Sequence, residues 1–253
     1  MPKVEERLRA LGSERAPAGF AERVIGAALG DAYAPVDTVI GRFWVAWNGS
    51  RISAVQLMQE AEFVAWFERE TRRPLRRVES VPDRVRERVL EMRGRDLVYD
   101  LSSISPFERA VLMKTLEIPR GEVRTYSWVA REIGAPRAVR AVGTALANNP
   151  IPLLIPCHRV VRSDGVIGNY GAGGPVAKKR LLALEGVRVE ELEQLARRRT
   201  RFIGSDTTHV FCVPTCRDAR RVTDRHRVEF RTEAEAEAAG YRPCRHCRPV
   251  AAA

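Results

Sequence analysis

A cysteine and a histidine stand side by side in the segment 155–161, which reads Ile-Pro-Cys-His-Arg-Val-Val. Cys157 is the only cysteine among the first 211 residues. A free thiol is mostly protonated at neutral pH, and an imidazole such as that of His158 can take its proton, directly or through one water, and leave a nucleophilic thiolate. The alternative is a buried structural cysteine beside an unrelated histidine, because free cysteine is among the most buried residue types. The surrounding sequence has to decide between these two interpretations.

Several short motifs surround this pair in a fixed order. They read Arg-Ala-Val-Gly at 140–143, Asn-Asn-Pro-Ile-Pro at 148–152, Gly-Asn-Tyr at 168–170 and Leu-Leu-Ala-Leu-Glu-Gly at 181–186. Together with the cysteine segment they closely resemble the 6-O-alkylguanine-DNA alkyltransferase family, whose members move an alkyl group from a damaged base onto their own cysteine. The resemblance covers roughly residues 38–187 and is strongest from Ser105 onward. It implies a DNA repair protein that acts once, since nothing in the sequence supplies a second acceptor for the alkyl group.

The resemblance also implies a role for each residue of the expected catalytic site. Cys157 is the implied nucleophile, His158 the base that acts through water, and Glu185 the acid that orients the histidine. Tyr126 is expected to face the leaving guanine oxygen and to help rotate the nucleotide outward, and Asn149 to brace the turn beneath the site. The implied walls of the substrate pocket are Val160, Asn169 and Tyr170.

A helix-turn-helix pattern precedes the cysteine segment. Ser105 predicts the N-cap of a first helix, a second helix is expected over residues 127–133 with Gly134 as its stop, and a third is expected from Pro136. The third helix has two faces: an inner one with Val139, Val142 and Leu146, and an outer one with Arg137, Arg140, Ala141 and Thr144. Two arginines over small side chains suit close approach to phosphates. The resemblance implies that Arg140 enters the base stack that an extruded nucleotide vacates.

Upstream of residue 103 the pattern changes twice. Residues 1–36 show a short helical pattern broken by Pro17 and Pro35, and we interpret them as an N-terminal arm of unknown role. Alternating aromatic residues from Gly41, followed by Asn-Gly at 48–49, predict a β-hairpin with a type I′ turn. Apolar residues at helical spacing and a further strand near 97–101 complete a small sheet-plus-helices domain over 37–102. Residues 103–187 are then expected to form a helical, winged-helix-like catalytic domain, which makes the fold class α+β.

Two close pairs of cysteines lie near the C-terminus, spaced as Cys212-x3-Cys216 and Cys244-x2-Cys247. Four thiolates in two such pairs predict a tetrahedral, structural Zn²⁺ site. The surrounding segment has few large apolar side chains, so the metal would supply part of its folding energy. We therefore expect a separate small zinc module over residues 198–249, and base repair that survives removal of the metal or truncation after Leu195.

The cysteine-rich segment resembles the metal-binding domain of Ada, in Phe-Cys-Val-Pro-Thr-Cys at 211–216 and again over 234–249. In Ada the first of the four cysteines accepts a methyl group from a DNA phosphotriester, and Cys212 is the matching residue. Two residues depart from the Ada pattern, because Val213 and His209 stand where it has Arg and Gly. Residues 202–205 also resemble shorter Ada-like modules for which no transfer is implied. The sequence leaves open whether Cys212 is a zinc ligand only or also a second methyl acceptor.

The bulk composition agrees with a nucleic-acid partner. The chain of 253 residues has 43 Lys and Arg against 32 Asp and Glu, a net charge of +11, which favours polyanions by counterion release. A solvated basic surface is the alternative explanation. No apolar run predicts a membrane span, the first residues lack a secretory signal, and an odd number of cysteines favours a reducing compartment. We expect a cytoplasmic monomer that binds double-stranded DNA carrying alkylated guanine and needs no organic cofactor.

Two rival functions belong to other classes. A lesion-binding protein without transfer activity would lack the nucleophile, and Cys157 is present. A cysteine-dependent hydrolase would need an oxyanion site and turnover, and it would leave no lasting adduct on the protein.

Overall fold

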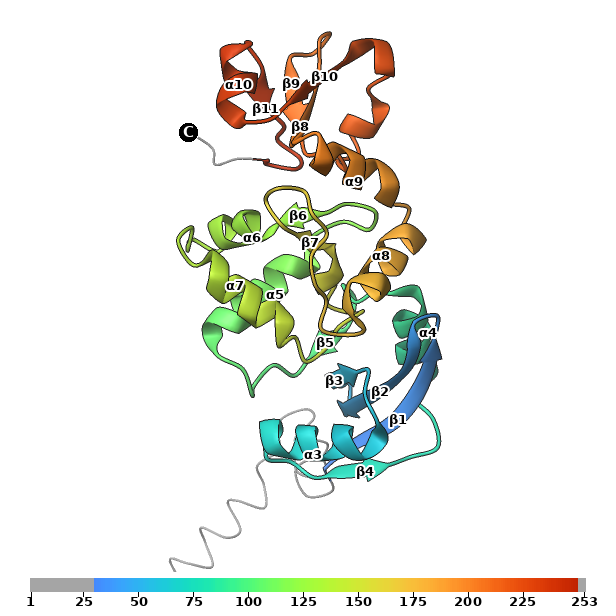
Figure 1. Cartoon of the computed structure of the whole chain (residues 1–253). Helices are drawn as coiled ribbons and strands as arrows, with labels where there is room; N and C mark the ends of the chain where they lie inside the picture. The colour runs from blue at the N-terminus through green and yellow to red at the C-terminus, as the bar shows by residue number, and fades with distance from the viewer. Residues whose placement is uncertain (1–29, 250–253) are drawn as a thin grey trace, which may run out of the picture.

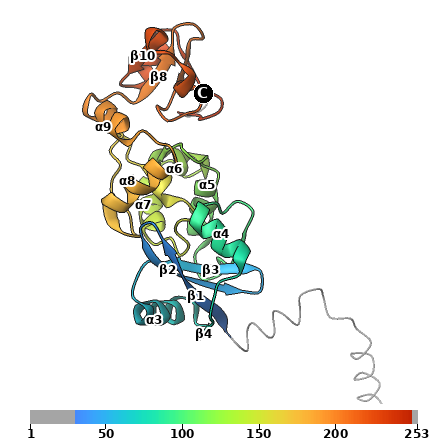
Figure 2. The same cartoon turned by 90° about the vertical axis from the view of Figure 1, so that its right-hand side faces the viewer.

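The computed structural model describes residues 30–249, which form three parts stacked one above another (Figures 1 and 2). The sheet region, residues 30–102, lies at one end, and the helical region, residues 103–187, lies in the middle. The cysteine module, residues 198–249, lies at the other end and is joined to the helical region by α9 (Val189–Arg197). The mixture of helices and separate sheets confirms the α+β fold class. Among these residues no helix combines the length and the apolar character that a membrane crossing requires.

The sheet region is built on one five-stranded sheet of order β4-β1-β2-β3-β5. Its strands are β1 (Asp31–Thr38), β2 (Gly41–Asn48), β3 (Arg51–Gln56), β4 (Leu75–Arg77) and β5 (Val98–Tyr99), with α3 (Glu60–Thr71) and α4 (Asp83–Glu91) between them. One face packs the aromatic side chains of Tyr33 and Trp44 against Phe63 and Phe67 of α3. The other face shares a single hydrophobic core with the helical region, so these two regions fold as one unit.

Two expectations about the sheet region are wrong. The boundary at residue 36 cuts through β1, which begins at Asp31 and pairs with β2 from Ala32 to Thr38. Pro35 is tolerated inside this strand because β4 pairs only with residues 31–33, so that one edge of β1 is open at Pro35.

The predicted hairpin is present, but Asn48 pairs with Arg51, which leaves Gly49 and Ser50 as the loop. Only Gly49 has a positive φ, 55°, whereas a type I′ turn needs two such residues. The helical pattern expected near residues 20–28 lies outside the described part of the chain.

The helical region contains α5 (Pro106–Leu116), α6 (Tyr126–Glu132), α7 (Val139–Ala147) and α8 (Gly174–Leu184). The predicted capping box is confirmed, because the Glu108 backbone N–H donates to Ser105 Oγ and the Ser105 N–H donates to Glu108 Oε2. Two short strands, β6 (Arg124–Thr125) and β7 (Val160–Val161), pair in parallel beside the helices. Gly134, with φ of 75°, ends α6 as predicted.

The third helix of this region, α7, starts three residues later than predicted. The Ala138 N–H donates to the Ala135 carbonyl at 2.9 Å, which closes a turn with Pro136 at its second position, where proline favours a turn. Arg137 therefore lies in the turn and not on the helix. The predicted faces are otherwise confirmed, since Arg140 and Ala141 are exposed while Val142 and Leu146 are buried.

The cysteine module is a second, four-stranded sheet of order β10-β8-β9-β11 with one helix. Its strands are β8 (Phe202–Ser205), β9 (Val210–Cys212), β10 (Arg227–Phe230) and β11 (Arg242–Pro243), and the helix is α10 (Glu233–Ala238). Short 3-10 turns at Ala219–Arg221 and Asp224–His226 lie between β9 and β10 along the chain. A small aromatic cluster of Phe211, Phe230 and Tyr241 packs on one side, and the cysteines pack with Leu195 of α9 on the other.

Candidate active site and metal centre

Cys157 lies at the start of a 3-10 turn, Cys157–Arg159, and is only 6% exposed. The Asn149 side chain holds the loop that leads to it. Its Nδ2 donates to the Ile155 carbonyl at 2.9 Å and to Cys157 Sγ at 3.1 Å, and its Oδ1 accepts from the Ile151 N–H at 3.0 Å. Asn149 thus ties both ends of the loop together and contacts the thiol itself. The sequence predicted that Asn149 braces the loop, but it did not predict the contact with the Cys157 thiol.

His158, Glu185 and Arg159 form a buried cluster behind the thiol. His158 Nε2 lies 3.1 Å from Glu185 Oε1, and the Arg159 Nε and Nη2 groups donate to the two oxygens of the same carboxylate at 2.8 and 2.7 Å. Glu185 comes from a later part of the chain, where it is the C-cap residue of α8. Within the described residues His158 Nδ1 is buried without a hydrogen-bond partner, so this nitrogen is the one available for proton transfer.

Burial and hydrogen bonds set the protonation states of this cluster. Burial lowers the pKa of His158 below its usual value, against the effect of Glu185, which favours a neutral imidazole. Burial alone would raise the pKa of Glu185, but hydrogen bonds from His158 and Arg159 outweigh it and lower the pKa to about 2. Burial raises the pKa of the Cys157 thiol, and the Asn149 hydrogen bond and the Lys178 charge act in the opposite direction. A neutral base therefore lies beside a thiol that needs a base.

A cavity of about 230 Å³ opens over Cys157. Its lining includes Tyr126, Asn169 and Tyr170 among the residues singled out from sequence, together with Gly143, Leu146, Ala147 and Gly171. The Tyr170 ring meets the His158 ring edge-on, with centroids 6.1 Å apart. Val160 is the exception, because it does not line this cavity but is fully buried in the core. As the first residue of β7 it is turned into the region's main hydrophobic cluster.

Lys178 is a site residue that sequence reasoning missed. Its side chain is 1% exposed, its Nζ donates to the Val160 and Asn169 carbonyls at 2.7 and 3.1 Å, and it lies over the Tyr126 ring. Burial lowers its pKa to about 8, and the neighbouring Cys157 works against this shift. The available signal was its position on α8, three and four residues before the buried Leu181 and Leu182.

The residues expected to meet DNA lie on an open surface. Arg137, Arg140 and Ala141 are all exposed, and neither arginine forms an ion pair with any residue from 30 to 249. Gly143 of α7 lines the Cys157 cavity. The helix that carries Arg140 therefore borders the opening to the thiol.

The four cysteines of the cysteine module converge on one point. Their Sγ atoms lie within 4.8 Å of one another, and all four side chains are buried. Parallel pairing of β9 with β11 brings Cys212, at the end of β9, close to Cys244, which follows β11. Four convergent thiols are the donor set of a tetrahedral metal site, so these residues fit a metal ion. Asp218 and His246 lie beside Cys244, with His246 Nδ1 2.6 Å from Asp218 Oδ2.

Comparison with known sequences gives two family matches. The family described as "6-O-methylguanine DNA methyltransferase, DNA binding domain" matches residues 106–187, and the "Metal binding domain of Ada" matches residues 195–250. The methylated-DNA–protein-cysteine methyltransferase of Rattus norvegicus is 54% identical over 82 residues, which are 32% of this chain and 39% of the rat protein. The chain thus spans well under half the length of that relative. The corresponding protein of Methanothermobacter thermautotrophicus is 37% identical over 151 residues, which are 58% of this chain and 80% of that protein.

Comparison with solved structures agrees. The OGT protein of Mycobacterium tuberculosis, crystallised in complex with DNA, matches with a TM-score of 0.53 and 29% identity, over 64% of this chain and 99% of that one. The chain shares the fold of that protein, and in this fold Cys157 lines a cavity beside a buried histidine–glutamate pair. The chain belongs to the methylated-DNA–protein-cysteine methyltransferase family and has a metal-binding domain of the Ada type at its C-terminal side.

Proposed function

We propose that this protein repairs DNA by moving the alkyl group of 6-O-alkylguanine in double-stranded DNA onto Cys157, once and irreversibly. The observation that carries the proposal is the Cys157 thiol at a cavity of about 230 Å³, with a buried base and acid behind it. In this reaction a sulfur–carbon bond forms at the alkyl carbon while the carbon–oxygen bond to guanine breaks. The guanine oxygen leaves with the bond's electron pair and is protonated.

The chain's own residues supply each proton movement. His158, neutral because burial lowers its pKa, accepts the thiol proton at Nδ1, and the Glu185 carboxylate, held in place by Arg159, stabilises the imidazolium that results. The positive charge of Lys178 and the Asn149 amide favour the thiolate. Tyr126 lines the cavity with its hydroxyl protonated, since burial raises its pKa, and it is the proposed donor to the guanine oxygen.

We further propose that α6 and α7 bind duplex DNA, because chemistry on a base edge requires the nucleotide to leave the stack. Arg140 and Arg137 would contact the strand, and small side chains at Ala141 and Gly143 would permit close approach. The cysteine module is proposed to hold a structural Zn²⁺ ion, since four thiolates match its preferred coordination. We also propose that the protein acts as a monomer in the cytoplasm, where thiols stay reduced.

The test of this function is Cys157→Ser. A hydroxyl is far less acidic than a thiol, so we expect the variant to take up no methyl group from duplex DNA containing 6-O-methylguanine while it still binds that duplex. Mass spectrometry of the intact protein measures the transfer, and a gel-shift titration measures binding. Stoichiometric methylation of the variant would refute the assignment of Cys157. Repeated turnover by the wild type without a lasting adduct would favour the hydrolase instead.

A further inference from the structure

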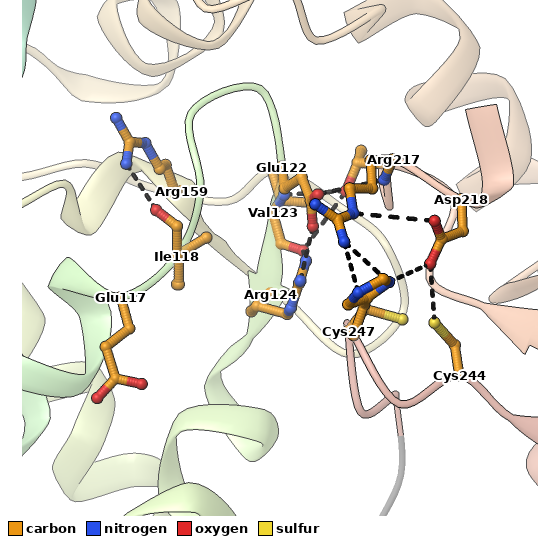
Figure 3. A network of polar contacts seen from close by, with 12 residues as sticks. Glu117, Ile118, Glu122, Val123, Arg124, Arg159, Arg217, Asp218, Cys244 and Cys247 are labelled. Carbon is orange, nitrogen blue, oxygen red and sulfur yellow. Dashed lines mark hydrogen bonds and ion pairs between the residues drawn. The ribbon is translucent and has the colours of Figure 1, made fainter. Parts of the chain in front are cut away.

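The cysteine module packs directly against the segment that leads into the active site. In Figure 3, Glu122, Val123 and Arg124 face Arg217 and Cys247 across the boundary between the two regions. The Val123 N–H donates to Thr215 Oγ1 at 2.9 Å, and the Arg217 N–H donates to Glu122 Oε1 at 3.2 Å. These contacts join residues more than 90 positions apart in the chain.

Glu122 lies at the centre of this interface. Its carboxylate is buried, with one oxygen accepting from the Arg217 backbone and the other from Arg124 Nη2 at 2.6 Å. Arg124 is buried as well, and its guanidinium lies over the Trp128 ring. Burying a charged pair is costly unless both partners are fully engaged. Here one of the carboxylate's two partners comes from the cysteine module, so Glu122 has both of its hydrogen-bond partners only when the module is docked.

Trp128 of α6 is hydrogen-bonded to a residue of the candidate metal site. Its Nε1 donates to the Cys247 carbonyl at 3.1 Å. Arg248, the next residue, also lies over the Trp128 ring and pairs with Glu132 of α6 at 2.7 Å. Arg131 of the same helix donates to the Arg248 carbonyl at 2.7 Å. The position of these carbonyls depends on the fold of the 244–247 turn, whose two cysteines belong to the candidate metal site.

Residues 121–128, which contact the cysteine module, are continuous with the active site. Tyr126 follows β6 directly and begins α6, and β6 pairs with β7, which follows the Cys157–Arg159 turn. On its other side the segment passes close to the backbone of Glu185, because a Cβ added at Gly121 would lie 2.9 Å from the Glu185 carbonyl oxygen. Residues 121–128 are thus held between the cysteine module and the residues that surround Cys157.

We propose that the metal-loaded cysteine module is a brace that positions β6 and the start of α6, with Glu122 and Trp128 as positioning residues. Loss of the metal then loosens residues 122–131 and slows alkyl transfer. Conversely, loss of the interface weakens retention of the metal, because coupling between two sites is reciprocal. The effect on transfer rests on the proposed function, whereas the effects on backbone protection and metal retention do not.

Hydrogen exchange on the full-length protein, with and without its metal, tests the brace directly. Removal of the metal by a strong chelator is expected to speed exchange across residues 122–131, although none of them is a metal ligand. Helix α3, residues 60–71, lies at the far end of the molecule and serves as the internal control (Figure 1). Unchanged exchange across 122–131 on metal removal would overturn the proposal.

The reciprocal test uses Trp128→Phe, which keeps an aromatic ring and removes the N–H that binds the Cys247 carbonyl. A lost hydrogen bond of about 1 kcal/mol corresponds to roughly fivefold faster release of the metal to a chromogenic chelator. Trp66→Phe is the matched control, because Trp66 packs beside Phe63 and Phe67 in the sheet region. Equal release rates for both variants and the wild type would argue against the brace, and the exchange experiment decides the question if Trp128→Phe does not fold.

Transfer assays separate this inference from the proposed function. If the loaded wild type methylates Cys157 and the metal-free protein does so several-fold more slowly, both stand. Equal rates for the two forms would show that the module is independent, as the sequence alone suggests. Absence of transfer by the loaded protein would remove the proposed function but leave the exchange and metal-release results to decide on the brace.

Discussion

Glu185 is the residue on which the electrostatics of the site depend. Its two oxygens accept from Arg159 twice and lie next to His158, and all three side chains are nearly excluded from solvent. A buried charge cluster contributes little net stability compared with a well-packed apolar core, so its presence beside a cysteine is better explained by function. Removing one partner, however, leaves the others uncompensated.

We therefore predict that Glu185→Gln destabilises the protein in a pH-dependent way. The pKa of Glu185 is lowered to about 2, below its ordinary value of 4.5, so its carboxylate stabilises the fold fully above pH 4.5 and loses that effect as the pH falls toward 2. At neutral pH the loss is expected to be about 3 kcal/mol. Chemical denaturation across this pH range measures it, and the difference from wild type should shrink on acidification.

Glu190→Gln provides the control for that experiment, because Glu190 is exposed and lies five residues further along the chain. It should leave the unfolding free energy within about 0.5 kcal/mol of wild type at every pH. A Glu185→Gln effect that stays constant from neutral pH down to pH 2 would show that the carboxylate's charge is not what stabilises the fold.

The residues that carry chemistry could be predicted from sequence where a motif marks them, and not where only three-dimensional packing does. Cys157 and His158 are adjacent, and Glu185 lies in a motif of its own, so all three were placed in one site and the structure brings them together. Arg159 and Lys178 were missed. Their importance comes from partners on other elements, such as Glu185 and the Asn169 carbonyl, which no local pattern shows.

Among the elements, those with strong local signals were predicted best. The Ser105 capping box and the Gly134 stop fix the ends of α5 and α6 through local hydrogen bonds and backbone angles. The start of α7 was misplaced because the Pro136 turn competes with helix extension. The strand β1 was missed because Pro35 was interpreted as a break, whereas proline is acceptable on an open strand edge. Tertiary context decided both cases.

At the scale of α7, we predict that Arg140→Ala slows transfer from duplex DNA on the order of tenfold while it weakens nonspecific binding only slightly. Arg140 is exposed on the helix that borders the Cys157 cavity, so it can stabilise an extruded base, whereas one phosphate contact is a small part of the total charge. Single-turnover kinetics with methylated duplex measures the rate.

Two comparisons make the Arg140 experiment specific. Arg180→Ala removes the same charge from the exposed surface of α8 and should leave the rate unchanged. Transfer from free 6-O-methylguanine needs no extrusion, so Arg140→Ala should match the wild type with that substrate. A wild-type rate on duplex DNA would mean that Arg140 is only a surface charge.

For the molecule as a whole, the sequence located the modules but not the way they meet. The cysteine spacing marked the segment that the metal-binding family matches, and the motifs around Cys157 marked the segment that the methyltransferase family matches. Their contact depends on single residues such as Thr215 and Trp128, which meet partners 92 and 119 positions away. Contacts at such separations leave no periodicity in the sequence. The sequence therefore led us to expect that the cysteine module and the region around Cys157 are independent of each other, whereas the structure shows them in contact.

Whether the cysteine module also accepts a methyl group is a question about the whole chain, because it sets how many groups one molecule can take up. Cys212 is 3% exposed, and Cys216, Cys244 and Cys247 are between 0 and 4% exposed, so burial does not set Cys212 apart as an acceptor. We predict that DNA carrying both 6-O-methylguanine and methyl phosphotriesters adds one methyl group per chain, on Cys157 alone. Intact mass gives the stoichiometry and peptide mapping the site. In Cys157→Ser the same DNA should add none, and a methyl group on Cys212 of that variant would instead establish a second acceptor.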